Sequence, residues 1–318
     1  MIGSIENIVQ KHEGKVSIVK GVCKDLSRNG RDVPYKVYGI THTGVGKRPL
    51  ILWSHGLGGS RDGAGFLARF LVEHGYFVMH IQHEGTDTSL WEGKPGHPWD
   101  VIRATPITRE VTLDRYRDVS FILDQLPMLE KEHALIRGHI DYDRLGMSGH
   151  SFGALTAQVM AGQLFPNEDD VLSSYKEARF KAGVLYSFSG MSHLSDAPAE
   201  HVFGGMDIPL LFMSGTKDDS PISGQDYTHR LPAYAHARAV EKHVLIIEEG
   251  DHMIFTGSRG KLAFNPKREV QEALIQASSL AFWEAYLNDN QDAKTWLTGD
   301  GFQEQFGPEM QYKYKETL

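Results

Sequence analysis

Residues 146–162 read GMSGHSFGALTAQVMAG, and the fold can be worked out from this stretch. An apolar run, RLGM at 144–147, precedes a serine that stands between two glycines, and small residues and alanines follow it. This order predicts a buried strand that turns sharply into a helix at Ser151. A hydroxyl at the start of a helix lies where developing negative charge is stabilised. Ser151 is therefore the first candidate functional residue.

Short apolar runs alternate with helical patterns on both sides of this stretch. Strands are expected at 15–23, 33–40, 49–53, 76–82, 144–147, 182–188, 209–215 and 243–250. Helices are expected at 64–75, 111–129, 152–162 and 270–287. The alternation predicts a mostly parallel central sheet with right-handed crossovers and helices on its faces, an α/β architecture. The first two strands are joined closely and would add an antiparallel edge.

Two regions fall outside this alternation. Residues 84–110 are polar, rich in glycine and proline, and contain two tryptophans, which predicts a long loop or partial lid. The tail after Asn288 is polar with scattered aromatic residues, and we expect it to pack on the surface. No linker divides the chain, so residues 1–318 are expected to form a single domain.

Composition excludes several classes of function. The chain has 41 acidic and 33 basic residues and a formal net charge of −8, which argues against nucleic acid as a partner. Its one cysteine, Cys23, cannot form an intramolecular disulfide and fits a reducing compartment. The first residues lack the apolar run of a signal peptide, and no stretch is long enough to span a membrane. A cytoplasmic location is expected, and the oligomeric state stays open.

The pentapeptide around Ser151 matches the G-x-S-x-G pattern of a nucleophile in a strained turn. Side chains at Gly149 and Gly153 would collide with neighbouring backbone, which explains both glycines. A serine hydroxyl is a poor nucleophile at neutral pH and needs a general base, which in turn needs an orienting group. In this setting the order along the chain is serine, acid, histidine.

Two strand ends downstream supply candidates for the acid and the base. HVLIIEEGDHMIF, residues 243–255, ends in Gly-Asp-His, which makes His252 the predicted base. PLLFMSGTKDDSP, residues 209–221, ends in a turn with two carboxylates. Asp218 has the usual spacing from the glycine at the end of the strand and is the predicted acid, with Asp219 as the alternative. Asp251 adjoins the base, and a sequence neighbour rarely reaches the far imidazole nitrogen.

Hydrolysis by a serine also requires two N–H groups that stabilise an oxyanion. The residue after the nucleophile, Phe152, supplies one of them. The second should come from the loop after an early strand, where HGLGG stands at 55–59, and the N–H of Leu57 is the predicted donor. The segment does not fit a phosphate-binding loop, because it lacks the lysine and the glycine spacing of those motifs.

Five motifs of the chain resemble those of a known family. HGLGGSRDG, HEGTDTSLW, RYRDVSFILDQL, GHSFGALT and GTKDDSPI together resemble the predicted dienelactone hydrolase group, close to the platelet-activating-factor acetylhydrolases in the α/β-hydrolase superfamily. The resemblance covers about residues 20–300. It implies an α/β-hydrolase fold with about eight strands, a serine triad and esterase activity. True dienelactone hydrolases use a cysteine where this chain has Ser151, so the family label does not name the substrate.

Histidines and tryptophans outside these motifs are candidates for the substrate pocket or for a metal site. His83, Trp91 and Trp99 are the candidates for the pocket; the tryptophans would cover an acyl or aryl group or anchor the loop. His80 and His83 stand three apart at the end of a strand, where their side chains should diverge, so no metal site is expected.

These observations together predict a serine esterase that needs no cofactor and acts on a small-molecule ester with a short acyl or small aryl group. A polyester or phthalate-ester hydrolase is the alternative within the same chemistry. A non-catalytic binding protein of the same fold is the alternative from another class. The triad does not name the leaving group, so an amidase or carbon–carbon hydrolase also stays open.

Overall fold

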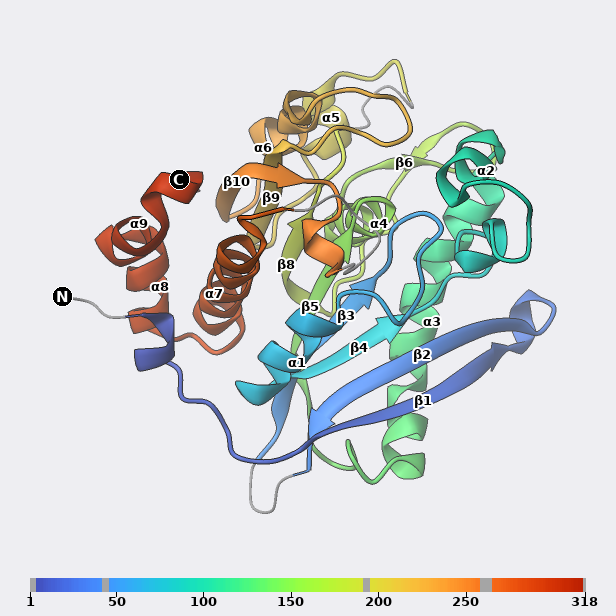
Figure 1. Ribbon diagram of the computed structural model, residues 1–318. Coiled ribbons are helices and arrows are strands. Elements are labelled where there is room, and N and C mark those ends of the chain that lie inside the picture. The colour runs from blue at the N-terminus through green and yellow to red at the C-terminus, as the bar shows by residue number, and fades with distance from the viewer. Residues whose placement is uncertain (1–3, 42–45, 191–194, 258–264, 317–318) are drawn as a thin grey trace.

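A mixed sheet covered by helices on both faces forms the centre of the molecule (Figure 1). The computed structural model describes residues 4–41, 46–190, 195–257 and 265–316. The strands of the large sheet are β1 (Val16–Asp25), β2 (Arg31–Ile40), β3 (Arg48–Ser54), β4 (Phe77–Ile81), β5 (Ile140–His150), β8 (Phe180–Tyr186), β9 (Leu210–Lys217), β10 (Glu241–Asp251) and β11 (Met310–Glu316). The helices are α1 (Gly65–Glu73), α2 (Pro98–Ala104), α3 (Arg109–Glu132), α4 (Phe152–Ala161), α5 (Ala199–Phe203), α6 (Leu231–His236), α7 (Arg268–Leu287), α8 (Gln291–Thr298) and α9 (Asp300–Phe306).

The order of the strands identifies the fold. In the described part of the chain nine strands follow the order β1-β2-β4-β3-β5-β8-β9-β10-β11. The strands from β4 to β10 in this order are parallel, whereas β1, β2 and β11 join antiparallel at the two edges. A separate small hairpin pairs β6 (Phe165–Pro166) with β7 (Leu172–Ser173). Each predicted strand and helix is present, and the predicted α/β-hydrolase fold is confirmed.

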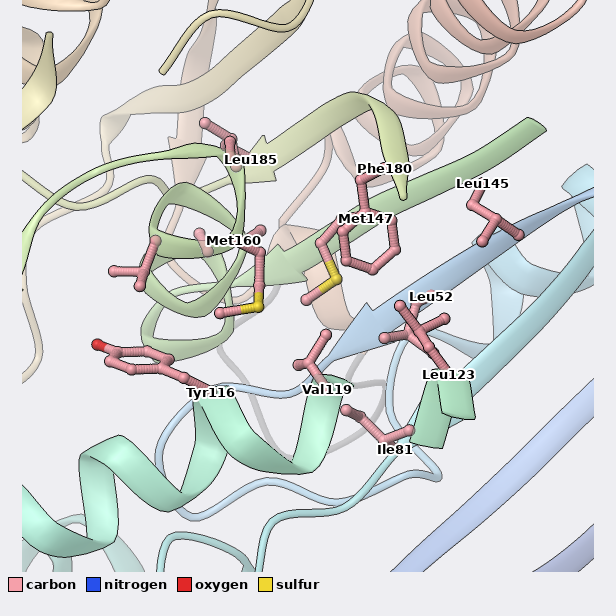
Figure 2. Close-up of a cluster of buried hydrophobic side chains, with 14 of the residues drawn as sticks. Leu52, Ile81, Tyr116, Val119, Leu123, Leu145, Met147, Met160, Phe180 and Leu185 are labelled. Atoms are coloured by element: carbon pink, nitrogen blue, oxygen red, sulfur yellow. The ribbon is translucent and has the colours of Figure 1, made fainter. Parts of the chain in front are cut away.

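Alternating side chains of the central strands pack into two separate hydrophobic clusters. Every residue of β3 is buried. Leu50 and Leu52 face the cluster formed with α3 and α4, while Ile51 and Trp53 face the cluster formed with α1 and α7. Figure 2 shows the first cluster, in which side chains of α3, such as Val119 and Leu123, point toward the strands. A strand buried on both faces reads as a continuous apolar run, which is how β3 appears in the sequence.

The segment after Asn288 was predicted to pack on the surface, but much of it is part of the fold. After Asn288 the chain forms α8 and α9 and then returns as β11, which pairs antiparallel with β10. Trp296 and Phe302 are both 0% exposed and belong to the cluster on the α7 face. The scattered aromatic residues of this segment therefore complete the core instead of covering it loosely.

The segment at 84–110 is more ordered than a plain loop. It contains a short 3-10 helix, Thr88–Leu90, and then α2 (Pro98–Ala104), capped by the side chain of His97.

No helix among the described residues has the length and apolar character that a membrane crossing requires.

Candidate active site

Ser151 occupies the turn that connects β5 to α4. Its φ of 56° and ψ of −115° are strained for a residue with a side chain. The neighbouring glycines make the turn possible, because a Cβ on Gly149 would stand 2.2 Å from the carbonyl oxygen of Gly153. A Cβ on Gly153 would stand 1.9 Å from the carbonyl oxygen of Ser54. Neither backbone contact leaves room for a larger residue, so both glycines serve the geometry of the turn.

The ends of β9 and β10 bring the other two predicted side chains to this turn. Nε2 of His252 lies 3.0 Å from Oγ of Ser151. Nδ1 of the same ring lies 2.7 Å from Oδ1 of Asp218. With the carboxylate ionised, Nδ1 carries the ring proton and donates it, which leaves Nε2 to accept from the serine hydroxyl. The three side chains form one continuous chain of hydrogen bonds.

The other two carboxylates considered in the sequence face elsewhere. Asp218 is 0% exposed, whereas Asp219 is exposed to solvent. Oδ1 of Asp251 accepts the N–H of Met253 at 2.7 Å and so stabilises the turn after β10. Adjacent residues in a turn point in different directions, and among these three aspartates only Asp218 contacts the imidazole of His252 in the described part of the chain.

Several side chains missed in the sequence surround the carboxylate of Asp218. The hydroxyls of Ser187 and Ser214 donate to it at 3.0 and 2.7 Å, and Nη2 of Arg230 donates at 3.1 Å. Burial raises the pKa of Asp218, but the hydrogen bond and charge of His252, together with Arg230 and Ser214, bring it below its usual range. The acid is therefore ionised although it is buried. Ser187 and Ser214 lie near the ends of predicted strands, and that position could have identified them in the sequence. Arg230 belongs to no motif, so no sequence signal indicated its role.

His150, the residue before Ser151, holds the backbone of the predicted base. Its Nε2 donates to the carbonyl oxygen of His252 at 2.7 Å, and the two rings are 4.7 Å apart between centroids. Burial first, and then the neighbouring charge of His252, lower the pKa of His150 to about 3. His150 is therefore neutral and acts as a fixed donor. Its place inside the pentapeptide was the only sequence signal for it.

Leu57, Ser151 and Phe152 all line the wall of one cavity. Phe152 begins α4, and the first N–H groups of a helix have no partner inside the helix. Leu57 lies in the loop after β3, and no acceptor for its N–H is found among the described residues. Both predicted donors thus belong to segments that border the serine.

The cavity at Ser151 has a volume of about 480 Å³. This volume is within the range of small-molecule sites. The apolar part of its wall comprises Leu57, Ile107, Phe152, Leu155, Phe165, Pro166, Pro221 and Ile222. The polar part comprises Arg109, Thr112, Ser151, Ser189, Ser220, Ser223, Gln225, His229, Arg230 and His252.

The three side chains predicted for the pocket are absent from this wall. His83 is 0% exposed and lies behind the site, where its ring nitrogens contact Oγ of Ser54 at 2.9 Å and Oδ2 of Asp118 at 3.0 Å. A fully buried ring cannot touch a substrate. Nε1 of Trp91 donates to the carbonyl oxygen of Gly58 at 2.7 Å, so this tryptophan anchors its segment. Trp99 lies partly buried in the first turn of α2.

The histidines that could have suggested a metal have separate partners. Nδ1 of His80 donates to the carbonyl oxygen of Arg61 at 3.1 Å, while His83 contacts Asp118. Within the described ranges, no group of three or more histidine, cysteine, aspartate or glutamate residues is arranged to hold a metal ion.

Comparison with known proteins gives two relatives of one kind. Platelet-activating factor acetylhydrolase from the dog, Canis lupus familiaris, is 24% identical over 292 residues, which are 79% of this chain and 60% of the relative. The protein of the same name from cattle, Bos taurus, is 22% identical over 291 residues, with the same coverage. The chain is distantly homologous to these acetylhydrolases. It spans about 60% of the length of the curated relatives it matches. No protein-family model matches the chain.

Proposed function

We propose that this chain is a serine-dependent hydrolase of carboxylic esters that works through an acyl-enzyme. The observation that carries the proposal is the position of His252, which bridges Oγ of Ser151 at 3.0 Å and Oδ1 of Asp218 at 2.7 Å. The serine lies in a strained turn and opens on a cavity of about 480 Å³. Strained backbone at such a cavity is typical of functional sites.

The first half of the reaction forms the acyl-enzyme. Oγ of Ser151 attacks the carbonyl carbon of the ester while Nε2 of His252 takes the hydroxyl proton. The carbonyl oxygen becomes an oxyanion, which the N–H groups of Leu57 and Phe152 stabilise. The carbon–oxygen bond to the alcohol then breaks, and the imidazolium of His252 returns the proton to the departing alkoxide. Ser151 is left as an ester of the acyl group.

The second half releases the acid. Water attacks the acyl-enzyme, and Nε2 of His252 again takes a proton. The bond to Oγ of Ser151 breaks, the proton returns to Oγ, and the carboxylic acid leaves. Throughout both halves Asp218 fixes the ring tautomer and stabilises the imidazolium. Arg230 stabilises the ionised state of that carboxylate.

The wall of the cavity and the distant relatives support the substrate class. Leu155, Phe165 and Ile107 are among the apolar side chains of the wall and suit a short acyl chain or a small aryl group. The distant relatives are named acetylhydrolases, which agrees with release of a small acyl group. We therefore propose esters with a short acyl chain or a small aryl group as substrates.

Labelling with a fluorophosphonate tests the nucleophile directly. The wild-type chain should form a covalent adduct at Ser151 and hydrolyse p-nitrophenyl esters, with the rate falling as the acyl chain outgrows the cavity. Ser151→Ala should abolish both. Ser223→Ala is a matched control, because this serine lines the same cavity without contacting His252. A chain that neither labels nor hydrolyses any ester in the series would instead be a binding protein of this fold.

A further inference from the structure

Arg115 is a fully buried cation behind the candidate active site. It lies on α3 and is 0% exposed. Its guanidinium donates to Oγ1 of Thr156, Oγ1 of Thr86, Oγ of Ser54 and the carbonyl oxygen of His55, at 3.1, 2.6, 2.9 and 2.5 Å respectively. A rigid fork of donors can hold several elements in one arrangement in a way that a flexible ammonium cannot.

These contacts reach both segments that border Ser151. Thr156 accepts from Arg115 and donates its own hydroxyl to the carbonyl oxygen of Phe152 at 3.0 Å. The guanidinium carbon also lies 4.4 Å from the centroid of the Phe152 ring. On the other side, the carbonyl of His55 leads directly into the loop that carries Leu57. A single side chain therefore connects the start of α4 to the loop after β3.

The direction of the Leu57 N–H follows from the same set of contacts. The carbonyl oxygen of Gly56 accepts Nδ1–H of His55 at 2.7 Å and the N–H of Gly59 at 3.0 Å. In a trans peptide the N–H points opposite to the C=O, so fixing Gly56 also aims the N–H of Leu57. Nε2 of His55 in turn accepts the N–H of His83 at 3.0 Å. Arg115 donates to the carbonyl oxygen of His55 and so helps to fix the backbone from which this loop starts.

Thr86 provides a second connection to the loop. Its hydroxyl accepts from Arg115 and donates to the carbonyl oxygen of His83 at 3.2 Å. Its backbone oxygen accepts the N–H of Gly58 at 2.8 Å. The residue after Leu57 is thus held from the same buried centre.

The charge of Arg115 has no direct carboxylate partner. Among the described residues no aspartate or glutamate forms an ion pair with it, and Asp118, one turn further on, pairs with Arg31 and His83. Burial lowers the pKa of Arg115 to about 9, which leaves it protonated at neutral pH. A buried charge that is not in contact with a carboxylate is costly, although Asp118 and Asp87 lie close enough to favour it electrostatically. A cation at this place therefore points to a use for positive potential there. The proposed reaction would gain from it when an oxyanion forms between Leu57 and Phe152, because Arg115 contacts the Phe152 ring and the carbonyl oxygen of His55.

We propose that Arg115 is the positioning residue of the oxyanion hole. It holds the N–H donors of Leu57 and Phe152 at the spacing that the oxyanion requires, and its charge stabilises the negative oxygen from behind. The inference rests on the proposed function. Because the oxyanion exists only in the transition state and the tetrahedral intermediate, losing Arg115 should lower kcat and leave substrate binding nearly unchanged.

Three variants test the role of Arg115 with p-nitrophenyl butyrate as substrate. Arg115→Met should lower kcat by about 10²- to 10³-fold while KM stays within about threefold. Arg115→Lys keeps the charge but loses the fork, so it should recover part of the lost rate. Arg117→Met is the matched control, because Arg117 lies on the same helix and pairs with Glu168 at the surface. Its kcat should stay within about twofold of wild type.

The affinity for an aliphatic trifluoromethyl ketone distinguishes support of the oxyanion from a merely structural role of Arg115. The ketone carbon forms a bond to Oγ of Ser151, and its oxygen becomes an oxyanion while His252 gains the proton. Its affinity should fall in parallel with kcat/KM across the Arg115 variants. A folded Arg115→Met with kcat within about threefold of wild type would overturn the inference.

If Arg115→Met does not fold, Thr86→Val tests the inference in its place. This change removes one acceptor of the guanidinium and leaves Arg115 in place. It should lower kcat about tenfold at constant KM, and a loss below about twofold would also overturn the inference. Failure of the proposed function looks different: either the wild-type chain would neither label nor hydrolyse any ester, or Ser151→Ala would retain the labelling or the hydrolysis.

Discussion

Nδ1 of His252 lies 2.7 Å from Oδ1 of Asp218, although the two residues are 34 positions apart in the chain. The contact follows from the sheet. Asp218 comes directly after β9 and His252 directly after β10, and these two strands are adjacent and parallel. The carboxyl ends of parallel strands meet at one edge, so the two side chains are brought together by strand pairing. Asp219, one residue further, is exposed.

The two neighbouring aspartates should therefore respond very differently to substitution. Asp218→Asn removes the charge that fixes the tautomer of His252 and stabilises its imidazolium, and it should lower kcat on the order of 10⁴-fold. Asp219→Asn should cost less than about tenfold. Ester hydrolysis by both variants, with melting temperatures to exclude unfolding, measures the difference. A large loss in Asp219→Asn with Asp218→Asn near wild type would reverse the assignment.

Removing the proposed nucleophile, Ser151, and the proposed base, His252, together should cost little more than removing either. Ser151→Ala should lower the turnover of esters by about 10⁴-fold or more. His252→Ala added to that variant should change the residual rate by less than about tenfold, because proton transfer has no function once the hydroxyl is gone. Steady-state rates of the two single variants and the double variant give the comparison. Additive losses would mean that the two residues act in separate steps.

The side chains that meet at the candidate site were predictable because each follows a strand with a clear apolar run. Ser151, Asp218 and His252 all stand at such ends, and the order of the strands places those ends together. The turn at Ser151 also carries a local requirement, since only glycine fits at Gly149 and Gly153. Local patterns of this kind can be read from one sequence.

The residues that support the site were harder to predict. Arg230 reaches Asp218 from the segment before α6, and Arg115 reaches the loop after β3 from α3. Each contact joins distant parts of the chain, and an arginine on a helix carries no local sign of its partner. The burial of Trp296 was missed for the same reason. Its helix is polar overall, and only the packing against α7 shows that the aromatic side chain belongs to the core.

The close approach at Gly153 predicts a large effect from one methyl group. A Cβ there would stand 1.9 Å from the carbonyl oxygen of Ser54 and 2.8 Å from that of His55, and both are backbone atoms. Gly153→Ala should lower the free energy of unfolding by about 2 kcal/mol or more, because the turn and the loop after β3 must separate. Gly63→Ala is the control, since its nearest neighbour would be 3.7 Å away. Urea unfolding compares the two, and equal stabilities would contradict the packing described for the turn.

Buried neutral histidines should make the protein sensitive to mild acid. Burial lowers the pKa of His80, His150 and His243 to about 3 and that of His83 to about 4, and the pKa of His55 lies well below its usual range. In the unfolded chain the same groups take up protons near pH 6.5. The folded pKa is thus below the unfolded one, so the stability is fully present above about pH 6.5 and falls as the pH drops toward about 4. Each histidine contributes about 1.4 kcal/mol per pH unit in that window.

Urea unfolding between about pH 7.5 and about pH 4.5 measures this dependence, and His80→Phe isolates one histidine. Phenylalanine keeps a ring against Trp53, whose centroid lies 5.6 Å from that of the His80 ring. It loses the hydrogen bonds of the imidazole to the backbone of Arg61 and Gly63. The variant should be less stable than wild type at neutral pH. Below about pH 6 its free energy of unfolding should fall less steeply than that of wild type, by about 1.4 kcal/mol per pH unit. His201→Asn, at an exposed position, should leave the slope unchanged. An identical slope in His80→Phe and wild type would show that His80 is protonated in the folded state, because only a group that is neutral when folded contributes to acid unfolding in this way.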